Sequence, residues 1–581
     1  MSEKTPKRDL SELRSQRWFA SDDMRGFAHR QRTQQMGMRR EEFMGRPVIG
    51  IINTWSDMSP CHAHLRDRAE AVKRGVWQAG GYPVELPALS VGEVMVKPTT
   101  MLYRNFLAME CEELLRCHPI DGAVLLGGCD KSTPALLMGS ISMDIPVIFC
   151  PAGPMSNGQW RGVKTGAGTH TKKYWDELRA GNITKDDWVD LESRMTRSAG
   201  TCNTIGTAST MTSIADAMGM TLPGASSIPA TDSGHPRMAS ACGVRIVEMV
   251  WEDLKPSKIL TRESFMNGLV AYMALGGSTN AAVHMIAMAK RAGVDLTLDD
   301  MSAMAAKVPV VTNVFPSGEY LMEDFYFAGG LNALLNKMSR HLALDCLTVN
   351  GLTLGENIKD ASCWNDDVIR DEANPVVPLS KGKTLEVLRG NLAPNGAVMK
   401  SSAANPKFLK HLGPAIVFDD PATMNKTLDN PDLDITEDTV IILRNAGPVG
   451  APGMPEWGNL PIPKKLLKQG VRDMVRISDA RMSGTHYGTC VLHVSPEAAI
   501  GGPLALVETG DMIALDIAAG TINMQVDEAE LEARRAAWKP SAKLYDRSFA
   551  ALYQRHVSQA DQGCDFDFLS GTETVPDPVI F

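Results

Sequence analysis

Short apolar runs alternate with helical patterns through the first 150 residues, and this alternation restricts the fold more than any other feature. Apolar runs of strand length occur at 47–55, 81–86, 120–126 and 145–150, and helical stretches at 61–80, 99–117 and 132–142 separate them. Strand–helix–strand units at this spacing predict a mostly parallel sheet with helices on both faces. This part of the chain is therefore predicted to be α/β.

The secondary-structure pattern and the composition of the chain change after about residue 155. Residues 155–345 are mostly helical in pattern, and the region around 365–395 is rich in Asp, Pro, Lys and Gly. Short β-like runs then follow at 415–418, 439–443, 473–477, 489–494, 512–516 and 521–526. We expect an N-terminal α/β/α domain over residues 1–380 and a smaller β-rich, barrel-like domain with flanking helices over residues 381–581.

Composition excludes several classes of protein. The chain has 581 residues with 59 Lys+Arg against 68 Asp+Glu, a net charge of −9, which is not the basic footprint of a nucleic-acid binder. No apolar run approaches the roughly 18–20 residues that span a bilayer, and no secretory signal pattern is present. Eleven cysteines, an odd number, indicate reduced thiols. We therefore expect a cytoplasmic protein with no membrane or nucleic-acid partner.

Side chains with reactive groups follow three of the expected strands. Cys61 follows the first strand, Glu93 the second, and the run Cys129, Asp130 and Lys131 the third. In open α/β sheets, ligands bind just beyond the carboxyl ends of the strands. These five residues are therefore expected to meet in one crevice.

A third cysteine of interest, Cys202, lies in SAGTCNTIG just before a helical stretch, whose N-terminus would favour a thiolate. Three thiols from distant segments suit an iron–sulfur cluster with one open position or a metal ion. Zinc is the rival ligand, although the chain has no C-x-x-C pair. Buried structural cysteine is the simpler alternative. His62 and His64, beside Cys61, are expected on the surface or in supporting roles.

Carboxylates and one serine extend the candidate site. Glu93 and Asp130 carry the hard oxygen ligands that Mg²⁺ prefers, and Glu456 in the Gly/Pro-rich stretch 445–458 is a further candidate. Turn-forming or helix-capping carboxylates are the alternative. Ser483, in SDARMSGTHYGTC, could act as a base only if cations or N–H groups stabilised its alkoxide, and otherwise it is an ordinary turn serine. Neither the P-loop spacing nor a nicotinamide-binding fingerprint is present.

Six motifs, in order along the chain, resemble those of the IlvD/Edd dehydratases. They are SPCHAHL, LLGGCDKSTPA, SAGTCNTIGTASTM, MALGGSTNAAVHM, GPVGAPGMPE and ARMSGTHYG, and the resemblance runs from about residue 25 to residue 560. Two further stretches, ALSVGE and CPAGPMSNGQWRG, are most similar to the sugar-acid branch of that family, which includes L-arabinonate and D-xylonate dehydratases.

This resemblance implies a fold, an assembly and a set of ligands. It implies an active site between an N-terminal α/β/α domain and a C-terminal barrel-like domain, in a homodimer or a homotetramer built as a dimer of dimers. The implied cluster is [2Fe–2S], with [4Fe–4S] as the alternative, and its ligands carry over to Cys61, Cys129 and Cys202. The implied Mg²⁺ ligands carry over to Glu93, Asp130, Glu456 and Lys131 as a carbamate.

The implied activity is that of a hydro-lyase. Ser483 would remove the C2 proton of an aldonate such as L-arabinonate or D-xylonate, the C3 hydroxyl would leave, and a 2-keto-3-deoxy acid would form; Thr485 is the implied substrate contact. A dihydroxyacid dehydratase of branched-chain amino-acid synthesis is the alternative within the family. An iron–sulfur redox carrier or sensor is an alternative of another class. One departure is the C-terminus VPDPVIF, ending at Phe581, because sugar-acid members place a tail, sometimes ending in His, near a neighbouring subunit's site.

Overall fold

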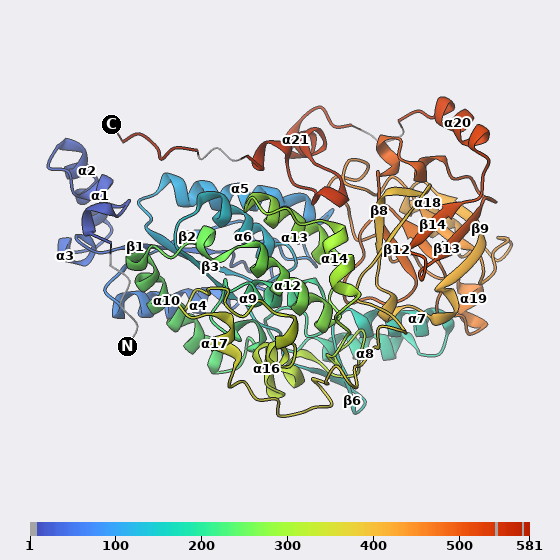
Figure 1. Cartoon of the computed structure of the whole chain (residues 1–581), viewed down its shortest axis with the longest axis horizontal. Helices are drawn as coiled ribbons and strands as arrows, with labels where there is room; N and C mark the ends of the chain where they lie inside the picture. Colours follow the sequence, from blue (N-terminus) through green and yellow to red (C-terminus); the bar gives the residue numbers. More distant parts are fainter. Residues whose placement is uncertain (1–7, 541–543, 572–574, 581) are drawn as a thin grey trace.

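The computed structural model describes residues 8–540, 544–571 and 575–580, so Phe581 lies outside the described residues. Two domains lie side by side (Figure 1). The first is built on a four-stranded sheet in the order β2-β1-β3-β4, and the second on a closed barrel in the order β10-β11-β12-β8-β7-β14-β13-β9. The predicted α/β class, with a barrel-like C-terminal domain, is confirmed.

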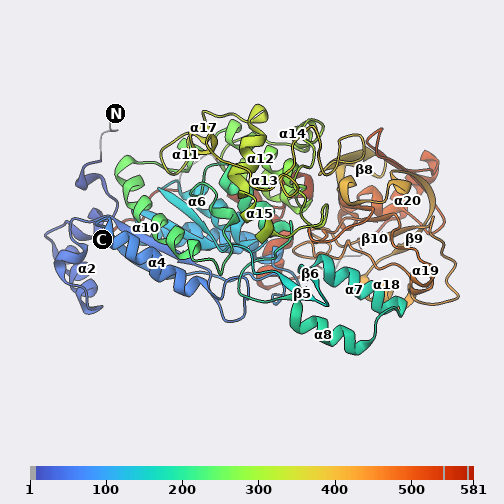
Figure 2. The same cartoon turned by 90° about the horizontal axis from the view of Figure 1, so that it is seen from below.

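All four strands of the N-terminal sheet are parallel. Helices α4 and α10 pack together against one face of this sheet, and α5 and α6 pack together against the other (Figure 2). Because helices cover both faces, every residue of β1, β3 and β4 is buried, which explains their continuous apolar runs. These elements are β1 (Val48–Asn53), α4 (Leu65–Gln78), β2 (Tyr82–Pro87), α5 (Met101–Cys117), β3 (Gly122–Gly127), α6 (Ser132–Met143), β4 (Val147–Pro151) and α10 (Gly234–Glu252).

Helices make up most of the remaining N-terminal domain. A hairpin and two helices, β5 (Gly158–Trp160), β6 (Val163–Thr165), α7 (Thr169–Ala180) and α8 (Lys185–Met195), project from the domain and reach the barrel side (Figure 2). The other helices are α1 (Gln16–Phe19), α2 (Met24–Gln35), α3 (Arg40–Phe43), α9 (Thr207–Ala217), α11 (Pro256–Ile259), α12 (Arg262–Leu275), α13 (Asn280–Arg291), α14 (Leu298–Ala305), α15 (Met322–Phe327), α16 (Gly330–Lys337) and α17 (Leu354–Ile358).

The barrel contains the six predicted strands and two that the sequence pattern missed, β7 and β8. Along β10, Val440 and Ile442 enter the barrel core, whereas Ile441 and Leu443 join an outer cluster with Met424. This alternation buries both faces of the strand. The elements are β7 (Glu386–Gly390), β8 (Ala393–Met399), β9 (Lys410–Phe418), α18 (Pro421–Thr427), β10 (Val440–Leu443), α19 (Lys464–Lys468), β11 (Arg476–Ser478), β12 (Cys490–Ser495), β13 (Met512–Asp516), β14 (Thr521–Met524), α20 (Glu528–Ala537) and α21 (Ser548–His556).

Two element boundaries differ from the sequence prediction in ways that affect the candidate site. Helix α4 begins at Leu65 rather than Cys61, because Cys61 and its neighbours form consecutive tight turns, such as the one in which the His62 N–H donates to Ser59 O at 2.9 Å. Strand β11 begins at Arg476 rather than Asp473, because the Asp473 carboxylate accepts hydrogen bonds from nearby backbone N–H groups and from Arg476.

The C-terminal segment returns to the N-terminal end of the chain. The carboxylate of Asp577 pairs with Arg14 at 2.8 Å, and Arg17 donates to Pro578 O at 2.7 Å. Figure 1 shows this segment beside α1 and α2, at the end of the molecule farthest from the barrel. Among the described residues, no helix is both long and apolar enough to cross a membrane.

A buried ion pair links α13 to the segment after α21. The Arg291 guanidinium, with no exposed side-chain area, holds Asp565 through two bonds of 2.8 and 3.0 Å. Removing one partner of a buried pair leaves the other charge uncompensated. We expect Asp565→Asn to lower the free energy of unfolding by about 3–5 kcal/mol, measured by denaturant titration. The matched control is Glu70→Gln at the exposed Glu70–Lys73 pair, for which a loss below about 1 kcal/mol is expected; equal losses would contradict the argument.

Candidate functional site

Two of the three candidate cysteines meet at the carboxyl edge of the parallel sheet. The Cys129 side chain, together with burial, raises the pKa of the Cys61 thiol, and both side chains are buried. The backbone N–H of Glu93 points to the Cys129 sulfur at 3.5 Å, so the segment after β2 joins the same cluster. All eleven cysteines are described, and none forms a disulfide.

Cys202 reaches the same cluster from the loop before α9. Its pKa is raised, because burial and the charges of Asp130 and Cys129 disfavour the thiolate. The sequence placed Cys202 immediately before a helix, but α9 begins only at Thr207, so Cys202 does not lie at its N-terminus. Three thiols in an anionic, buried environment would be deprotonated by binding a cationic centre.

His62 holds the three strand ends together. Its Nε2 accepts the Cys129 N–H at 3.1 Å, while its Nδ1 lies 3.3 Å from the Thr54 hydroxyl after β1 and 3.2 Å from the Ser90 hydroxyl after β2. Burial, assisted by the charge of His64, lowers the pKa of His62 to about 3, so the ring is neutral and carries its proton on Nδ1. Of the two roles expected for His62, at the surface or in support of the ligands, these contacts agree with the supporting one.

The candidate metal ligands surround one ammonium group. Lys131, which is fully buried, places its Nζ 2.9 Å from Glu93, 3.3 Å from Asp130 and 3.3 Å from Glu456. The three carboxylates raise the pKa of Lys131 against the opposing effects of burial and of Arg481. Burial raises the pKa of Asp130 to about 6, although Lys131 opposes it. Segments from both domains therefore build one cation-binding cage.

Three residues that the sequence reasoning missed complete this cage. Arg481, fully buried, donates to Glu456 at 2.9 Å and to the Thr99 hydroxyl at 3.1 Å, and Asn280 donates to Glu456 at 2.7 Å. The Thr100 hydroxyl donates to Glu93 through a short bond. Burial raises the pKa of Glu456, but the charges of Lys131 and Arg481 outweigh it and leave that pKa low. Arg481 and Asn280 both lie within the six motifs that resemble the dehydratase family, and this was the sequence signal that could have identified them.

Ser483 lies on a turn that packs against the N-terminal domain. Its Oγ is 2.9 Å from the Thr485 hydroxyl and 3.4 Å from the Thr485 N–H. A side chain on Gly484 would clash, because its Cβ would lie 2.3 Å from that of Ser278. Thr485 also faces Gly206, four residues after Cys202. The turn therefore lies beside the cysteine-bearing loop.

Asn280 connects this turn to the cage. Its side-chain amide donates to Glu456 and, at 3.1 Å, to the Thr207 hydroxyl, which lies 2.9 Å from the hydroxyl of Ser278. The residues predicted from separate parts of the sequence, from Cys61 to Thr485, are therefore neighbours in one site between the two domains.

The donor set is of the kind that the implied cofactors need. Thiols are soft ligands for iron, and carboxylate oxygens are hard ligands for Mg²⁺. Within the described residues, no three His, Cys, Asp or Glu side chains are already spaced to hold a metal ion, and the Lys131 ammonium lies among the carboxylates. A cage of three carboxylates around a cation fits a divalent ion in charge, so the chemistry of the residues fits both groups.

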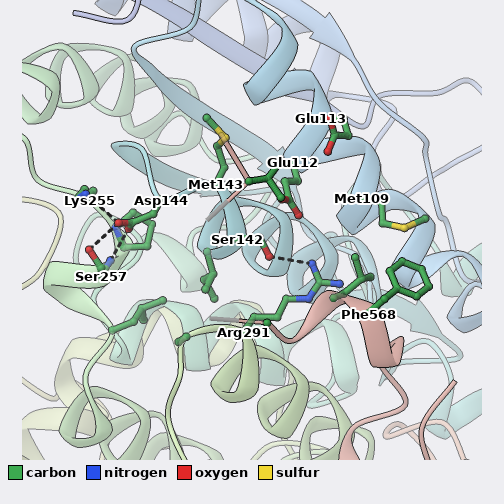
Figure 3. A pocket seen from close by; sticks show the side chains of 17 residues that line it. Met109, Glu112, Glu113, Ser142, Met143, Asp144, Lys255, Ser257, Arg291 and Phe568 are labelled. Atoms are coloured by element: carbon green, nitrogen blue, oxygen red, sulfur yellow. Dashed lines mark hydrogen bonds and ion pairs between the residues drawn. The ribbon is translucent and has the colours of Figure 1, made fainter. Parts of the chain in front are cut away.

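A surface cavity lies away from this site. It has a volume of about 750 Å³ and lies between the far ends of α5, α6 and α13, whose N-termini begin at the candidate site. Figure 3 shows several of its polar side chains paired with one another: Asp144 with Lys255 and Ser257, and Arg291 with Ser142. The convergence of charged groups therefore favours the strand-end site as the functional one.

Comparison with known proteins assigns the family. Residues 46–357 match the N-terminal domain of the dihydroxy-acid/6-phosphogluconate dehydratases, and residues 367–564 match their C-terminal domain. The chain belongs to this family. Its members are dehydratases, so the prediction of a hydro-lyase of the IlvD/Edd family is confirmed.

Individual dehydratases match the chain over nearly its whole length. It is 70% identical over 580 residues to a 6-deoxy-6-sulfo-D-gluconate dehydratase of Pseudomonas putida, with all of both chains covered. It is 49% identical to an L-arabinonate dehydratase of Rhizobium leguminosarum bv. trifolii, covering 96% of each chain. It is 39% identical to a dihydroxy-acid dehydratase of Caldanaerobacter subterraneus, covering 93% of this chain and 97% of that one. Identity is thus higher to these two sugar-acid enzymes than to the dihydroxy-acid enzyme.

Proposed function

We propose that this dehydratase removes water from a sugar acid and that 6-deoxy-6-sulfo-D-gluconate is its preferred substrate. The observation that carries the proposal is the 70% identity, over the complete chain, to an enzyme named for that substrate. L-Arabinonate and D-xylonate, the substrates expected from the sequence, are the alternatives among sugar acids. The reaction removes the C2 proton and the C3 hydroxyl as water, and the resulting enol becomes the 2-keto-3-deoxy acid.

Ser483 is proposed as the base that takes the C2 proton. Two donors on Thr485, its hydroxyl at 2.9 Å and its N–H at 3.4 Å, lie around Ser483 Oγ. Such donors stabilise negative charge on an alkoxide before the substrate arrives. Arg481 places a buried positive charge at the carboxylate cage, where it donates to Glu456. Thr485 is proposed to contact the substrate next to the base.

The cofactors of the sequence analysis are part of this proposal. Cys61, Cys129 and Cys202 would hold an iron–sulfur cluster, [2Fe–2S] with [4Fe–4S] as the alternative, and Glu93, Asp130, Glu456 and carbamylated Lys131 would hold Mg²⁺. When bound, these groups would supply Lewis acidity toward the leaving hydroxyl and the substrate carboxylate. Asn280 and Arg481, which both donate hydrogen bonds to Glu456, would fix the orientation of its carboxylate. The expected homodimer or homotetramer stays a prediction.

A substrate panel tests the proposed substrate. The purified, iron-loaded enzyme with Mg²⁺ is assayed for 2-keto acid formation from 6-deoxy-6-sulfo-D-gluconate, D-gluconate, L-arabinonate, D-xylonate and 2,3-dihydroxyisovalerate. We expect kcat/KM to be highest for the sulfonated acid, and D-gluconate is the matched control because it differs only in carrying a hydroxyl at C6 in place of the sulfonate. A difference of at least about tenfold corresponds to 1.4 kcal/mol of transition-state binding. Faster turnover of a pentonate would overturn the preferred substrate, and preference for 2,3-dihydroxyisovalerate would overturn the sugar-acid assignment.

A further inference from the structure

Lys400, directly after β8, is a buried cation to which the proposed reaction gives no role. Its side chain is 5% exposed, and burial alone lowers its pKa to about 7. Among the described residues it forms no ion pair, and its Nζ donates a short hydrogen bond to the backbone carbonyl of Gly276. Figure 1 shows β8 at the side of the barrel that faces the N-terminal domain.

Stability does not explain a lysine at this position. Burying an ammonium group without an opposite charge is unfavourable, and one backbone carbonyl offsets only part of that cost. An apolar side chain of similar length, such as methionine, would avoid the cost and fill the same space. A buried group that is costly for folding is more often retained for function than for stability.

The carbonyl that Lys400 binds lies at the start of a segment that supports the candidate site. Gly276 ends α12 with a φ of +67°, and the segment 276–280 leads from there into α13. Within this segment, Ser278 packs against Gly484 next to Ser483, and Asn280 donates to Glu456. A displacement of Gly276 would therefore be transmitted to both the proposed base and the carboxylate cage.

The residues after Lys400 contact the C-terminal end of the Ser483 turn. The Gly488 N–H, at the end of this turn, donates to Ala403 O at 2.9 Å. The segment Lys400–Ala403 thus contacts the turn directly at Gly488 and, through Gly276 and Ser278, at Gly484. Both contacts come from one short stretch of the barrel domain.

We propose that Lys400 is a positioning residue, which holds segment 276–280 against the Ser483 turn and so sets the distance between Ser483 and the carboxylate cage. The inference rests on the proposed roles of Ser483 and Glu456. Lys400 itself touches neither the substrate nor a cofactor in this proposal. It acts through the carbonyl of Gly276 at the domain interface.

Replacing Lys400 by methionine separates positioning from stability. For Lys400→Met in the full-length, iron-loaded enzyme, we expect an equal or higher melting temperature and unchanged visible absorbance. The kcat on the best substrate of the wild-type enzyme should fall about 10- to 100-fold, with KM changed less than about threefold, because misplacement by about 1 Å can cost 10²-fold in rate. Lys400→Arg, which keeps the charge and the donor, should recover part of the lost kcat. Lys383→Met is the matched control, since Lys383 pairs with Glu386 near the same segment, and no change in kcat is expected.

Several outcomes would overturn the inference. A lower melting temperature with unchanged kcat per folded enzyme would assign Lys400 a purely structural role, and a raised KM alone would place it in substrate binding. If Lys400→Met does not fold, Thr384→Val removes a second bond to the end of α12, from the Thr384 hydroxyl to Met273 O at 2.7 Å. An unchanged kcat in that variant would equally overturn it. Inactivity of the wild-type enzyme on every sugar acid, or full activity of Ser483→Ala, would instead refute the proposed function.

Discussion

Replacing Ser483 by alanine is expected to lower kcat by about 10²–10⁴-fold, the usual range for removing a positioned general base. The variant loses the only side-chain oxygen that we assign to the C2 proton, whereas the Thr485 hydroxyl and N–H remain in place. Ser483 is not among the proposed cofactor ligands, so iron content and visible absorbance should match the wild-type enzyme. The assay is 2-keto acid formation, with iron measured on the same sample.

The same experiment separates an enzyme from an iron–sulfur redox carrier. A carrier would tolerate Ser483→Ala, because electron transfer needs no base at this position. Ser213→Ala is the matched control: Ser213 is a buried serine, its hydroxyl has no hydrogen-bond partner among the described residues, and activity should be unchanged. If Ser483→Ala retained more than about a tenth of wild-type kcat, another group would have to take the proton, and the assignment of the base would be wrong.

The fold followed from the sequence wherever both faces of an element are buried. The strands β1, β3 and β4 are continuous apolar runs because helices pack on each side, and their parallel order placed Cys61 and Cys129 at one edge. Strand β8 was missed because Pro394 and Gly396 interrupt the pattern and two of its first three residues are exposed. Strand β7 was missed because it lies within the region around 365–395, whose Asp, Pro, Lys and Gly content was interpreted as a domain boundary.

The candidate site was predictable only in part. The strand-end rule applies to Glu93, Asp130 and Lys131, because regular elements fix where those segments end. Glu456 and Ser483 come from irregular loops of the other domain, and their positions depend on packing between domains, which no local pattern encodes. The sequence alone offered Glu456 as a candidate ligand and Ser483 as a base only under a condition, and the resemblance to a family implied both roles.

Supporting residues were the hardest to predict. His62 is adjacent to a predicted ligand, yet its role became visible only when the turns at the start of α4 buried its ring against Thr54 and Ser90. Asn280 occurs at the start of an apolar helix and looks like a cap. Lys400 gives no sequence signal, because a lysine after a strand is usually exposed. Their roles follow from tertiary contacts alone.

Replacing Cys129 by alanine is expected to remove the cluster and with it all measurable activity. Cys129 raises the pKa of the Cys61 thiol, receives the Glu93 N–H at its sulfur and is fixed by His62 through its own N–H, so it is the proposed ligand with the most contacts at the sheet edge. Two remaining thiols cannot hold a cluster that already lacks a fourth protein ligand. The variant should therefore be colourless, with iron and sulfide near zero per chain and no 2-keto acid formed.

Cys111→Ala is the matched control for this experiment. Cys111 is also fully buried, but its thiol donates to Leu136 O at 3.7 Å within the helical layer, and burial raises its pKa beyond the range of a reactive thiolate. Losing its sulfur creates a small cavity that costs stability and leaves the strand-end thiols unchanged. Colour, iron content and kcat should therefore stay near wild-type values. Retention of iron by Cys129→Ala, or loss of iron in Cys111→Ala, would contradict ligation by Cys61, Cys129 and Cys202. Those three thiols meet beside the carboxylate cage, whereas Cys111 does not.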